Sequence, residues 1–174
     1  MSPPPPDGAV AVDAETLLAD APAGHKRELR LWLCMLACAN LIEGEVRRRL
    51  RLAFGTTLPR FDLLAQLDRA GVEGLTLGEV SRRMMVSNGN VTGIAARLVA
   101  EGLVARRANP ADRRAGTLSL TVRGRREFAR QSAAHEEWIA ELLAGLTPAD
   151  QAALHRLLGR AKGGARAAIG GEPA

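Results

Sequence analysis

Apolar residues recur at helical spacing along much of the chain and divide it into short helices. The spacing predicts helices over about 25–53, 58–70, 77–85 and 88–101. Glycines mark three of the helix ends, at Gly55, Gly71 and Gly102. Thr76 and Glu79 form a capping box at the start of the third helix. A helix, a tight turn and a second helix between 76 and 102 predict a helix-turn-helix.

The pattern changes after Gly102, where two short β-prone runs replace the helical spacing. LVARR at 103–107 and TLSLT at 117–121 flank ANPADRRAG, which predicts an antiparallel hairpin with a long loop. Helices are expected again over about 122–146 and 148–168. A helix-turn-helix followed directly by a hairpin predicts a winged helix, in a fold that is mainly α with a small β-hairpin wing.

The composition of the two chain ends is that of loose tails, and it sets the expected organisation. We expect a disordered tail over 1–24, helical regions over 25–55 and 122–168, a winged helix-turn-helix lobe over 56–121 and a flexible tail over 169–174. The start lacks the basic and apolar segments of a signal peptide, and the apolar run 31–42 is too short to span a bilayer. The sequence therefore predicts a cytoplasmic protein without a membrane partner.

The charge balance of the 174 residues favours a negatively charged partner. The formal net charge is +5 and the sequence pI is about 10.4. Nearly all of the basic charge is arginine, since Lys26 and Lys162 are the only lysines, and genomic base composition is an alternative explanation for that bias. Where the arginines cluster is therefore more informative than how many there are.

The helix over 88–101 has one apolar side and one side of small residues. The residues expected to pack inward are Val91, Ile94, Ala95, Leu98 and Val99. The outer side carries Gly89, Asn90, Thr92, Gly93, Ala96, Arg97 and Ala100. A glycine in mid-helix costs about 1 kcal/mol relative to alanine, and small residues let a helix approach a DNA major groove closely. An ordinary surface helix in a protein rich in alanine and glycine is the alternative.

The polar residues of this helix suit the edges and phosphates of DNA. Asn88 and Asn90 offer hydrogen bonds to adenine or phosphate, and Thr92 can contact a thymine methyl group or phosphate. Arg97 can reach guanine or phosphate, and the first amides of the helix suit phosphate. The predicted DNA-contacting residues of the helix are Ser87, Asn88, Asn90, Thr92 and Arg97.

Four arginines cluster in the predicted hairpin. Arg113 and Arg114 are expected at its tip, where a narrow minor groove attracts inserted arginine. Arg106 and Arg107 are expected at its base, within reach of backbone phosphate. Asp112 is expected to hold an arginine or the loop amides, so that the tip is preformed. A solvated charged turn is the alternative.

The segment VSNGNVTGIAARLVAEGLVARRANPADRRAGTLSLTVRGRREF strongly resembles the winged helix of MarR-type transcriptional regulators. The residues that match the wing pattern of that family are Asp112, Arg113, Arg114, Leu120, Thr121 and Gly124. The resemblance covers about 29–158 and implies a homodimer, held by its first and last helices, that binds pseudo-palindromic double-stranded DNA as a repressor. It also implies a small aromatic or phenolic effector that binds between the dimer helices and the DNA-binding lobe and releases the repressor.

A finer resemblance, in GTTLPRFDLLAQLDR and MVSNGNVTG, is to a subgroup that controls aromatic-acid catabolism. Some members of this subgroup sense hydroxycinnamoyl-coenzyme A thioesters. Arginines at 47–49, 51 and 60 offer charge for the phosphates of such a ligand, or form a solvated helix end. The predicted effector-binding residues are Trp32, Met35, Arg47, Arg51, Phe54, Arg60, Phe61, His135 and Trp138, for which core or dimer interface is the alternative.

The sequence predicts no enzyme, no catalytic residue, no cofactor other than the effector and no metal site. It contains no Walker loop, nucleophile elbow or dinucleotide fingerprint, and its three histidines lack metal-ligand spacing. Cys34 and Cys38 lie four residues apart in an apolar run and are expected to be reduced thiols packed as small hydrophobic groups. A redox- or stress-responsive MarR-type regulator without a coenzyme A ligand is the alternative function.

Overall fold

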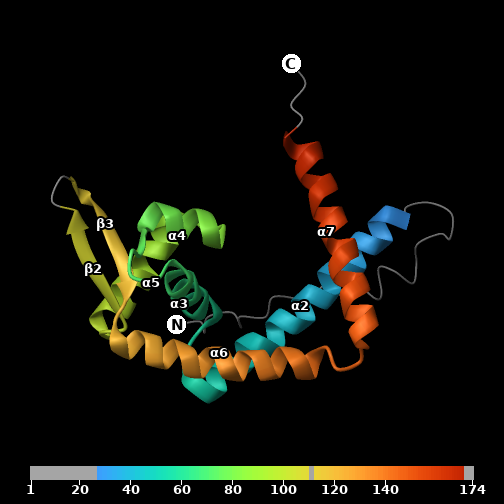
Figure 1. Cartoon of the computed structure of the whole chain (residues 1–174), viewed down its shortest axis with the longest axis horizontal. Helices are drawn as coiled ribbons and strands as arrows, with labels where there is room; N and C mark the ends of the chain where they lie inside the picture. Colours follow the sequence, from blue (N-terminus) through green and yellow to red (C-terminus); the bar gives the residue numbers. More distant parts are fainter. Residues whose placement is uncertain (1–26, 110–111, 171–174) are drawn as a thin grey trace, which may run out of the picture. The chain divides into compact units, whose positions relative to one another are not determined.

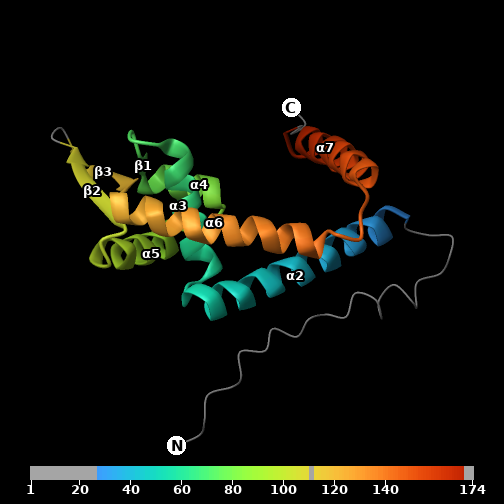
Figure 2. The same cartoon turned by 60° about the horizontal axis from the view of Figure 1, so that its bottom comes forward.

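The computed structural model describes residues 27–109 and 112–170 (Figures 1 and 2). The elements are α2 (Arg27–Phe54), α3 (Leu58–Ala70), β1 (Leu75–Thr76), α4 (Leu77–Met84), α5 (Asn88–Ala100), β2 (Val104–Asn109), β3 (Asp112–Leu120), α6 (Val122–Leu142) and α7 (Pro148–Gly170). The chain divides into two compact units between Ala133 and Ala134. The winged helix belongs to the first unit, and the fold class expected from the sequence is confirmed.

The local signals that predicted the first helices operate as expected. Gly55 takes a φ of 59° after α2, and Gly71 takes a φ of 65° after α3. The Thr76 hydroxyl accepts a hydrogen bond from the Glu79 amide at 3.3 Å, while the Glu79 carboxylate accepts one from the Thr76 amide at 2.8 Å. These reciprocal bonds satisfy two amides that the first turn of α4 would otherwise leave unpaired.

The sheet has three strands in the order β1-β3-β2, all antiparallel. The predicted nine-residue hairpin loop is wrong, because Ala108 and Asn109 extend β2 and the segment from Asp112 to Gly116 extends β3. Alanine and arginine have weak intrinsic preference for strands, but pairing between the two backbones overrides it. Strand β1 was not predicted either, and its two residues pair with Leu118 and Thr117.

The core of the first unit is built from leucine, valine and phenylalanine. Fully buried side chains come from every layer: Leu50, Leu63, Leu64, Leu67, Val80, Val91, Leu98, Val104 and Leu118. The Phe61 ring packs against that of Phe128, with their centroids 5.5 Å apart. These contacts fix α5 and the hairpin on α3 and the first part of α6, so the two elements expected to meet DNA share one rigid support.

The last two helices and the cysteines differ from expectation. Helix α6 ends at Leu142 rather than near 146, since turns occupy 143–145, and α7 continues to Gly170 rather than 168. Cys34 and Cys38 are both exposed, so the prediction of packed thiols is wrong for the single chain, whose α2 buries only Val46 and Leu50. None of the helices within 27–109 and 112–170 is both long and apolar enough to cross a membrane.

Met85 links α4 to α5 in a left-handed conformation that usually belongs to glycine. Its φ is 55° and its ψ 37°, and it is 92% exposed. Because a side chain costs about 1–2 kcal/mol in this conformation and Met85 contributes no burial, we expect Met85→Gly to raise the free energy of unfolding by about 1 kcal/mol. Urea denaturation measures the change, and an unchanged or lower stability would contradict the assignment of strain.

Candidate nucleic-acid interface and adjoining cavity

Helix α5 presents its small residues to solvent, as the sequence predicts. The exposed residues are Gly89, Asn90, Thr92, Gly93, Ala96, Arg97 and Ala100. On the opposite side Val91, Ala95 and Leu98 are buried, but Val99 is 37% exposed, so its predicted inward packing is wrong. Val99 lies about 80° around the helix from Val91, at the edge of the apolar stripe. The Asn88 side chain is outside the described residues, and its role stays a prediction.

Gly93 has no internal reason to be glycine. A Cβ atom built on it would meet no described atom of the chain within 4 Å, and its φ is not in the left-handed region. A helical glycine costs about 1 kcal/mol relative to alanine. Gly93 therefore lowers the stability of α5, and it avoids no steric clash with the described residues. The open space at Gly93 is what α5 needs if a surface is to approach it closely from outside.

The start of α5 leaves backbone amides uncapped by a side chain. Ser87 occupies the N-cap position with an extended backbone, but its side chain makes no capping hydrogen bond. The first amides of a helix carry partial positive charge and suit an anion such as phosphate. Ser87 and Asn90 are exposed beside these amides, which brings three of the predicted DNA-contacting features together at one helix end.

The hairpin carries its arginines on strands rather than on a loop. Arg106 and Arg107 lie in β2, opposite Leu118 and Thr117, and both are exposed. A Cβ atom at Gly116 of β3 would lie 3.0 Å from Nε of Arg106 on β2. The glycine therefore leaves space for the Arg106 side chain, which lies against β3. Asp112, Arg113 and Arg114 start β3, but their side chains lie outside the described residues, and their expected roles stay predictions.

The end of α5 is tied to the start of α6 through Thr121. The Thr121 hydroxyl donates to the Gly102 carbonyl at 2.8 Å and accepts from the Gly124 amide at 2.9 Å. A Cβ atom at Gly124 would lie 1.9 Å from the Leu103 carbonyl oxygen, so only glycine allows this approach. Two of the residues that carried the family resemblance, Thr121 and Gly124, therefore hold the end of α5 and the start of the wing against α6.

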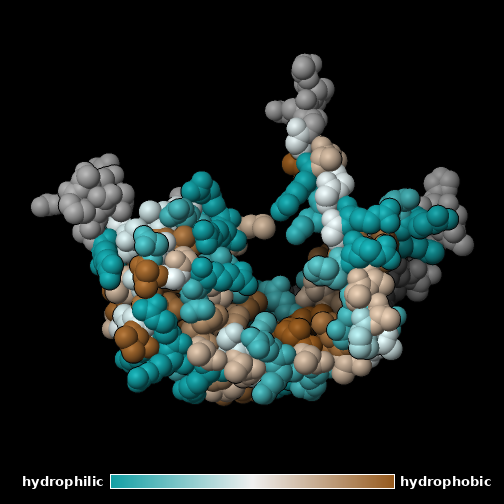
Figure 3. Space-filling view, in the orientation of Figure 1, coloured by the Kyte–Doolittle hydropathy of each residue, from teal (hydrophilic) through white to brown (hydrophobic). Residues whose placement is uncertain are grey.

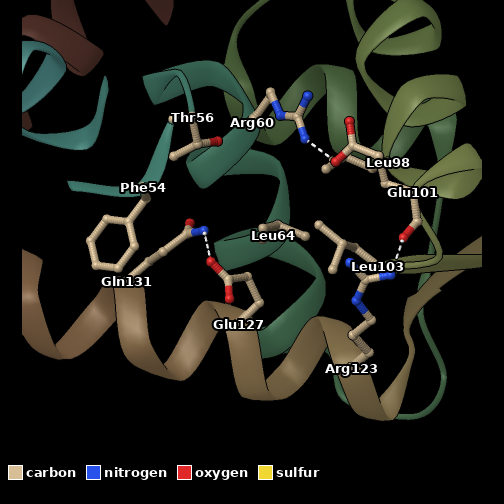
Figure 4. A pocket seen from close by; sticks show the side chains of 11 residues that line it. Phe54, Thr56, Arg60, Leu64, Leu98, Glu101, Leu103, Arg123, Glu127 and Gln131 are labelled. Atoms are coloured by element: carbon tan, nitrogen blue, oxygen red, sulfur yellow. Dashed lines mark hydrogen bonds and ion pairs between the residues drawn. The ribbon is translucent and has the colours of Figure 1, made fainter. Parts of the chain in front are cut away.

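A cavity of about 370 Å³ lies beside this junction, within the first unit (Figure 4). It is lined by Phe54, Gly55, Thr56, Arg60, Leu64, Leu98, Glu101, Leu103, Arg123, Glu127 and Gln131. Arg60 of α3 forms an ion pair with Glu101, the residue at the C-terminal end of α5. Figure 4 shows this pair on one side of the cavity, with Gln131 and Glu127 of α6 on the other.

The charged groups of the cavity are held mainly by one another. The hydrogen bond from Arg60 holds the pKa of the Glu101 carboxyl below its usual value, so Glu101 is ionised at neutral pH. The Arg123 guanidinium donates to the Glu101 backbone carbonyl at 2.9 Å. The Gln131 amide donates to Glu127 at 3.0 Å. Arg60 and Gln131 therefore each donate a hydrogen bond to a carboxylate of the cavity wall, Glu101 and Glu127 respectively. A ligand in the cavity would compete with these carboxylates for the two donors.

Of the predicted effector-binding residues, Phe54 and Arg60 line this cavity. Phe61 is a buried core residue that does not line it. On α2, Trp32 is 53% exposed, Met35 is half-buried, and Arg47 and Arg51 are exposed. His135 and Trp138 belong to the second unit and do not line the cavity. The arginines at 47–49 are paired within α2, since Arg47 pairs with Glu43, and Arg48 and Arg49 share Glu45. Their hydrogen bonds lower the pKa of Glu45 to about 2.

Comparison with known proteins connects this geometry to a family. The family model described as the MarR family matches residues 54–115. A solved MarR family transcriptional regulator from Silicibacter pomeroyi is 33% identical, with a TM-score of 0.63 over 80% of this chain and 99% of that one. The chain belongs to the MarR family. Sco3205, a MarR family regulator from Streptomyces coelicolor solved in complex with DNA, has the same fold, with 24% identity and a TM-score of 0.71 over 83% of this chain and 92% of that one.

A curated relative gives a further comparison for this MarR family chain. The transcriptional activatory protein BadR from Rhodopseudomonas palustris is 34% identical over 109 residues. The match spans 61% of this chain and 62% of the length of that relative. MarR family proteins are DNA-binding transcriptional regulators rather than enzymes, so this chain is classed as a regulator.

Several residues of the cavity were not predicted from the sequence. Glu101, Arg123, Glu127 and Gln131 line it, yet each has the ordinary appearance of a polar residue on a helix surface. One signal was available for Gln131, which follows Gly124 and Phe128 at helical spacing on the buried side of α6. A glutamine in such a stripe indicates a buried polar group that needs partners. Within 27–109 and 112–170, no group of three or more His, Cys, Asp or Glu residues is placed to hold a metal ion.

Proposed function

We propose that this chain is a homodimeric transcriptional repressor that inserts α5 into the DNA major groove and its arginine-bearing wing into the adjacent minor groove. The observation that carries the proposal is the exposed, small-residue face of α5, on which Gly93 leaves open space. A major groove admits one helix, and bulk on its outer face would hold that helix off the base edges. The exposed Arg97 on the same face, and Arg106 and Arg107 on β2, supply charge for base edges and phosphate.

The exposed apolar residues of the outer helices support a second copy of the chain as the partner. Leu31, Trp32 and Leu41 of α2 are more than half exposed, and Figure 3 shows hydrophobic surface over this helix. Helix α7 has no buried residue in the single chain, although Leu154, Leu157 and Leu158 lie at helical spacing. Apolar side chains left exposed on a helix in this way are typical of residues that an obligate interface covers. In a two-fold dimer the recognition helices would lie about 34 Å apart, matching half-sites one helical turn apart.

The cavity supports the other part of the proposal, an effector that releases the repressor. A volume of about 370 Å³ accommodates a small aromatic or phenolic acid, or the acyl part of its coenzyme A thioester. With the resemblance to regulators of aromatic-acid catabolism, we propose control of aromatic compound catabolism. Two observations favour alternatives: the relative BadR is named as an activatory protein, and the exposed Cys34 and Cys38 suit a redox-responsive regulator.

DNA binding is tested by titrating the protein into labelled promoter fragments from the neighbouring genes. Fluorescence anisotropy measures the binding at several salt concentrations. We expect the logarithm of the affinity to fall linearly with the logarithm of the salt concentration, with a slope set by the number of arginine–phosphate contacts. Phenolic acids and their coenzyme A esters are then added, and release of the DNA identifies the effector. Affinity that is equal for all sequences, or insensitive to salt, would contradict the proposal.

Two variants separate base contacts from phosphate contacts. We expect Asn90→Ala to reduce discrimination between the operator and a mismatched site by about 1–3 kcal/mol, because asparagine pairs with adenine edges in the major groove. Arg107→Ala should weaken binding to all sequences alike and lower the salt slope by about one, because the variant no longer neutralises a phosphate. Anisotropy titrations on both DNAs measure the two effects, and identical behaviour of the two variants would contradict these assignments.

A further inference from the structure

Both cysteines of the chain lie on α2, and both are exposed. Free cysteine is among the residue types most often buried, so two exposed thiols on one helix need an explanation other than core packing. Cys34 and Cys38 are four residues apart, which places them about 40° apart around the helix axis. Their Cβ atoms are therefore neighbours on one face of α2, at a separation of about 5–6 Å.

This separation is too wide for a disulfide within the helix, but it suits two ligands of one metal ion. A disulfide needs Cβ atoms about 3.5–4.5 Å apart, and the hydrogen-bonded backbone of a helix resists such a shift. Two thiolates that bind a single ion at about 2.3 Å each leave their sulfur atoms up to about 4.6 Å apart. The two side chains reach that arrangement by their choice of rotamer, so α2 can bind an ion without changing its backbone.

A third sulfur atom lies beside this pair, on Met35. Met35 precedes Cys38 by three residues, which makes the two side chains neighbours on α2, and its thioether is carried on a flexible, unbranched side chain. Residues 29–42 contain no Asp, Glu or His, so this part of α2 offers sulfur ligands and neither carboxylate nor imidazole. Thiolates and thioethers select soft ions such as Cu(I), whereas Mg²⁺ and Ca²⁺ prefer oxygen ligands. The ligand set therefore indicates a soft metal ion.

We propose that Cys34, Met35 and Cys38 form a sulfur-only binding site for a soft monovalent metal ion, Cu(I) or its analogue Ag(I). The ion replaces the protons of the two thiols, which leave to solvent, and neither the metal nor the sulfur changes its oxidation state. The apolar side chains of Leu31 and Leu41 lie about one turn before and after the pair of thiols, where they disfavour a hydrated, hard cation. All three ligands belong to one helix of one chain, so the site does not rest on the proposed function.

The test titrates Cu(I), in the absence of oxygen, into the reduced full chain together with bicinchoninate, a coloured chelator that competes for the ion. We expect each wild-type chain to take one ion from the chelator and to release protons as the thiolates bind. Cys34→Ser and Cys38→Ser should each lower the affinity by at least about 100-fold, because a hydroxyl is not a soft ligand. Met35→Leu should lower it by about tenfold, because it removes only the weaker thioether ligand. Met84→Leu is the matched control, at a half-buried methionine on α4, and it should leave the affinity unchanged.

X-ray absorption at the copper edge of the loaded wild type provides a measurement that needs no variant. We expect sulfur ligands alone around the ion, while circular dichroism checks that each variant folds as the wild type does. Nitrogen or oxygen ligands around the copper, or an affinity that either serine variant leaves unchanged, would overturn the proposal. One ion bound per two chains would also overturn it, because the site would then be built between helices rather than within α2.

Discussion

Replacing Gly93 with leucine should abolish specific DNA binding while making the protein itself more stable. The space around this position is open in the free chain, since a Cβ atom built there has no neighbour within 4 Å outside its own helix backbone. Leucine is a far better helix former than glycine, by roughly 0.8 kcal/mol. On DNA the same side chain would stand between α5 and the base edges. We expect affinity for the operator to fall by at least about 100-fold, or about 2.7 kcal/mol, measured by anisotropy alongside thermal unfolding.

The opposite signs of the two effects make this test informative. Gly78→Leu is the control, because Gly78 is also a helical glycine with open space around it but lies on α4, outside both the proposed reading face and the proposed dimer interface. It should gain stability too and keep full DNA affinity. Gly93→Ala should give an intermediate loss of affinity. If Gly93→Leu binds the operator as tightly as the wild type, α5 does not enter the groove through this face.

Gly124→Ala should destabilise the whole first unit. The added methyl group would lie 1.9 Å from the Leu103 carbonyl oxygen and 2.9 Å from its carbon, and both are backbone atoms that no rotamer change can move. The wing and α6 would have to separate, which breaks the Thr121 hydrogen bonds. Overpacking of this kind costs about 3 kcal/mol, so we expect the melting temperature to fall by roughly 10 °C, measured by calorimetry.

Gly78→Ala provides the control for that substitution. Gly78 lies in the first turn of α4 as Gly124 lies in the first turn of α6, but a Cβ atom there meets nothing within 4 Å. The control should be neutral or slightly stabilising. A melting temperature of Gly124→Ala within about 2 °C of the wild type would mean that the close approach to Leu103 is not essential.

Local chemistry explains which parts of the fold the sequence predicted well. Capping residues and glycines act within a few positions, so the ends of α3 and α4 followed from Thr76, Glu79 and Gly71. The exposed face of α5 followed from helical periodicity alone. The hairpin was underestimated because its strands at 108–109 and 112–116 depend on pairing between segments, which the individual residues do not encode.

The cavity could not have been predicted in the same way. Arg60 and Glu101 are 41 residues apart, and neither stands out on its own helix. Their ion pair exists because α3 and the end of α5 pack together in the core. The arginines of α2 were misleading for a related reason, since Arg47, Arg48 and Arg49 already form ion pairs with two carboxylates one turn away, Glu43 and Glu45. The cavity thus depends on long-range packing more than the exposed face of α5 does.

The hydroxyl of Thr121 has a wider consequence for how the molecule moves. One oxygen serves both the last turn after α5 and the first turn of α6, so neither helix can tilt without straining the other. We therefore expect α5 and the first turns of α6 to move together, so that a small rotation of one helix changes the position of the other.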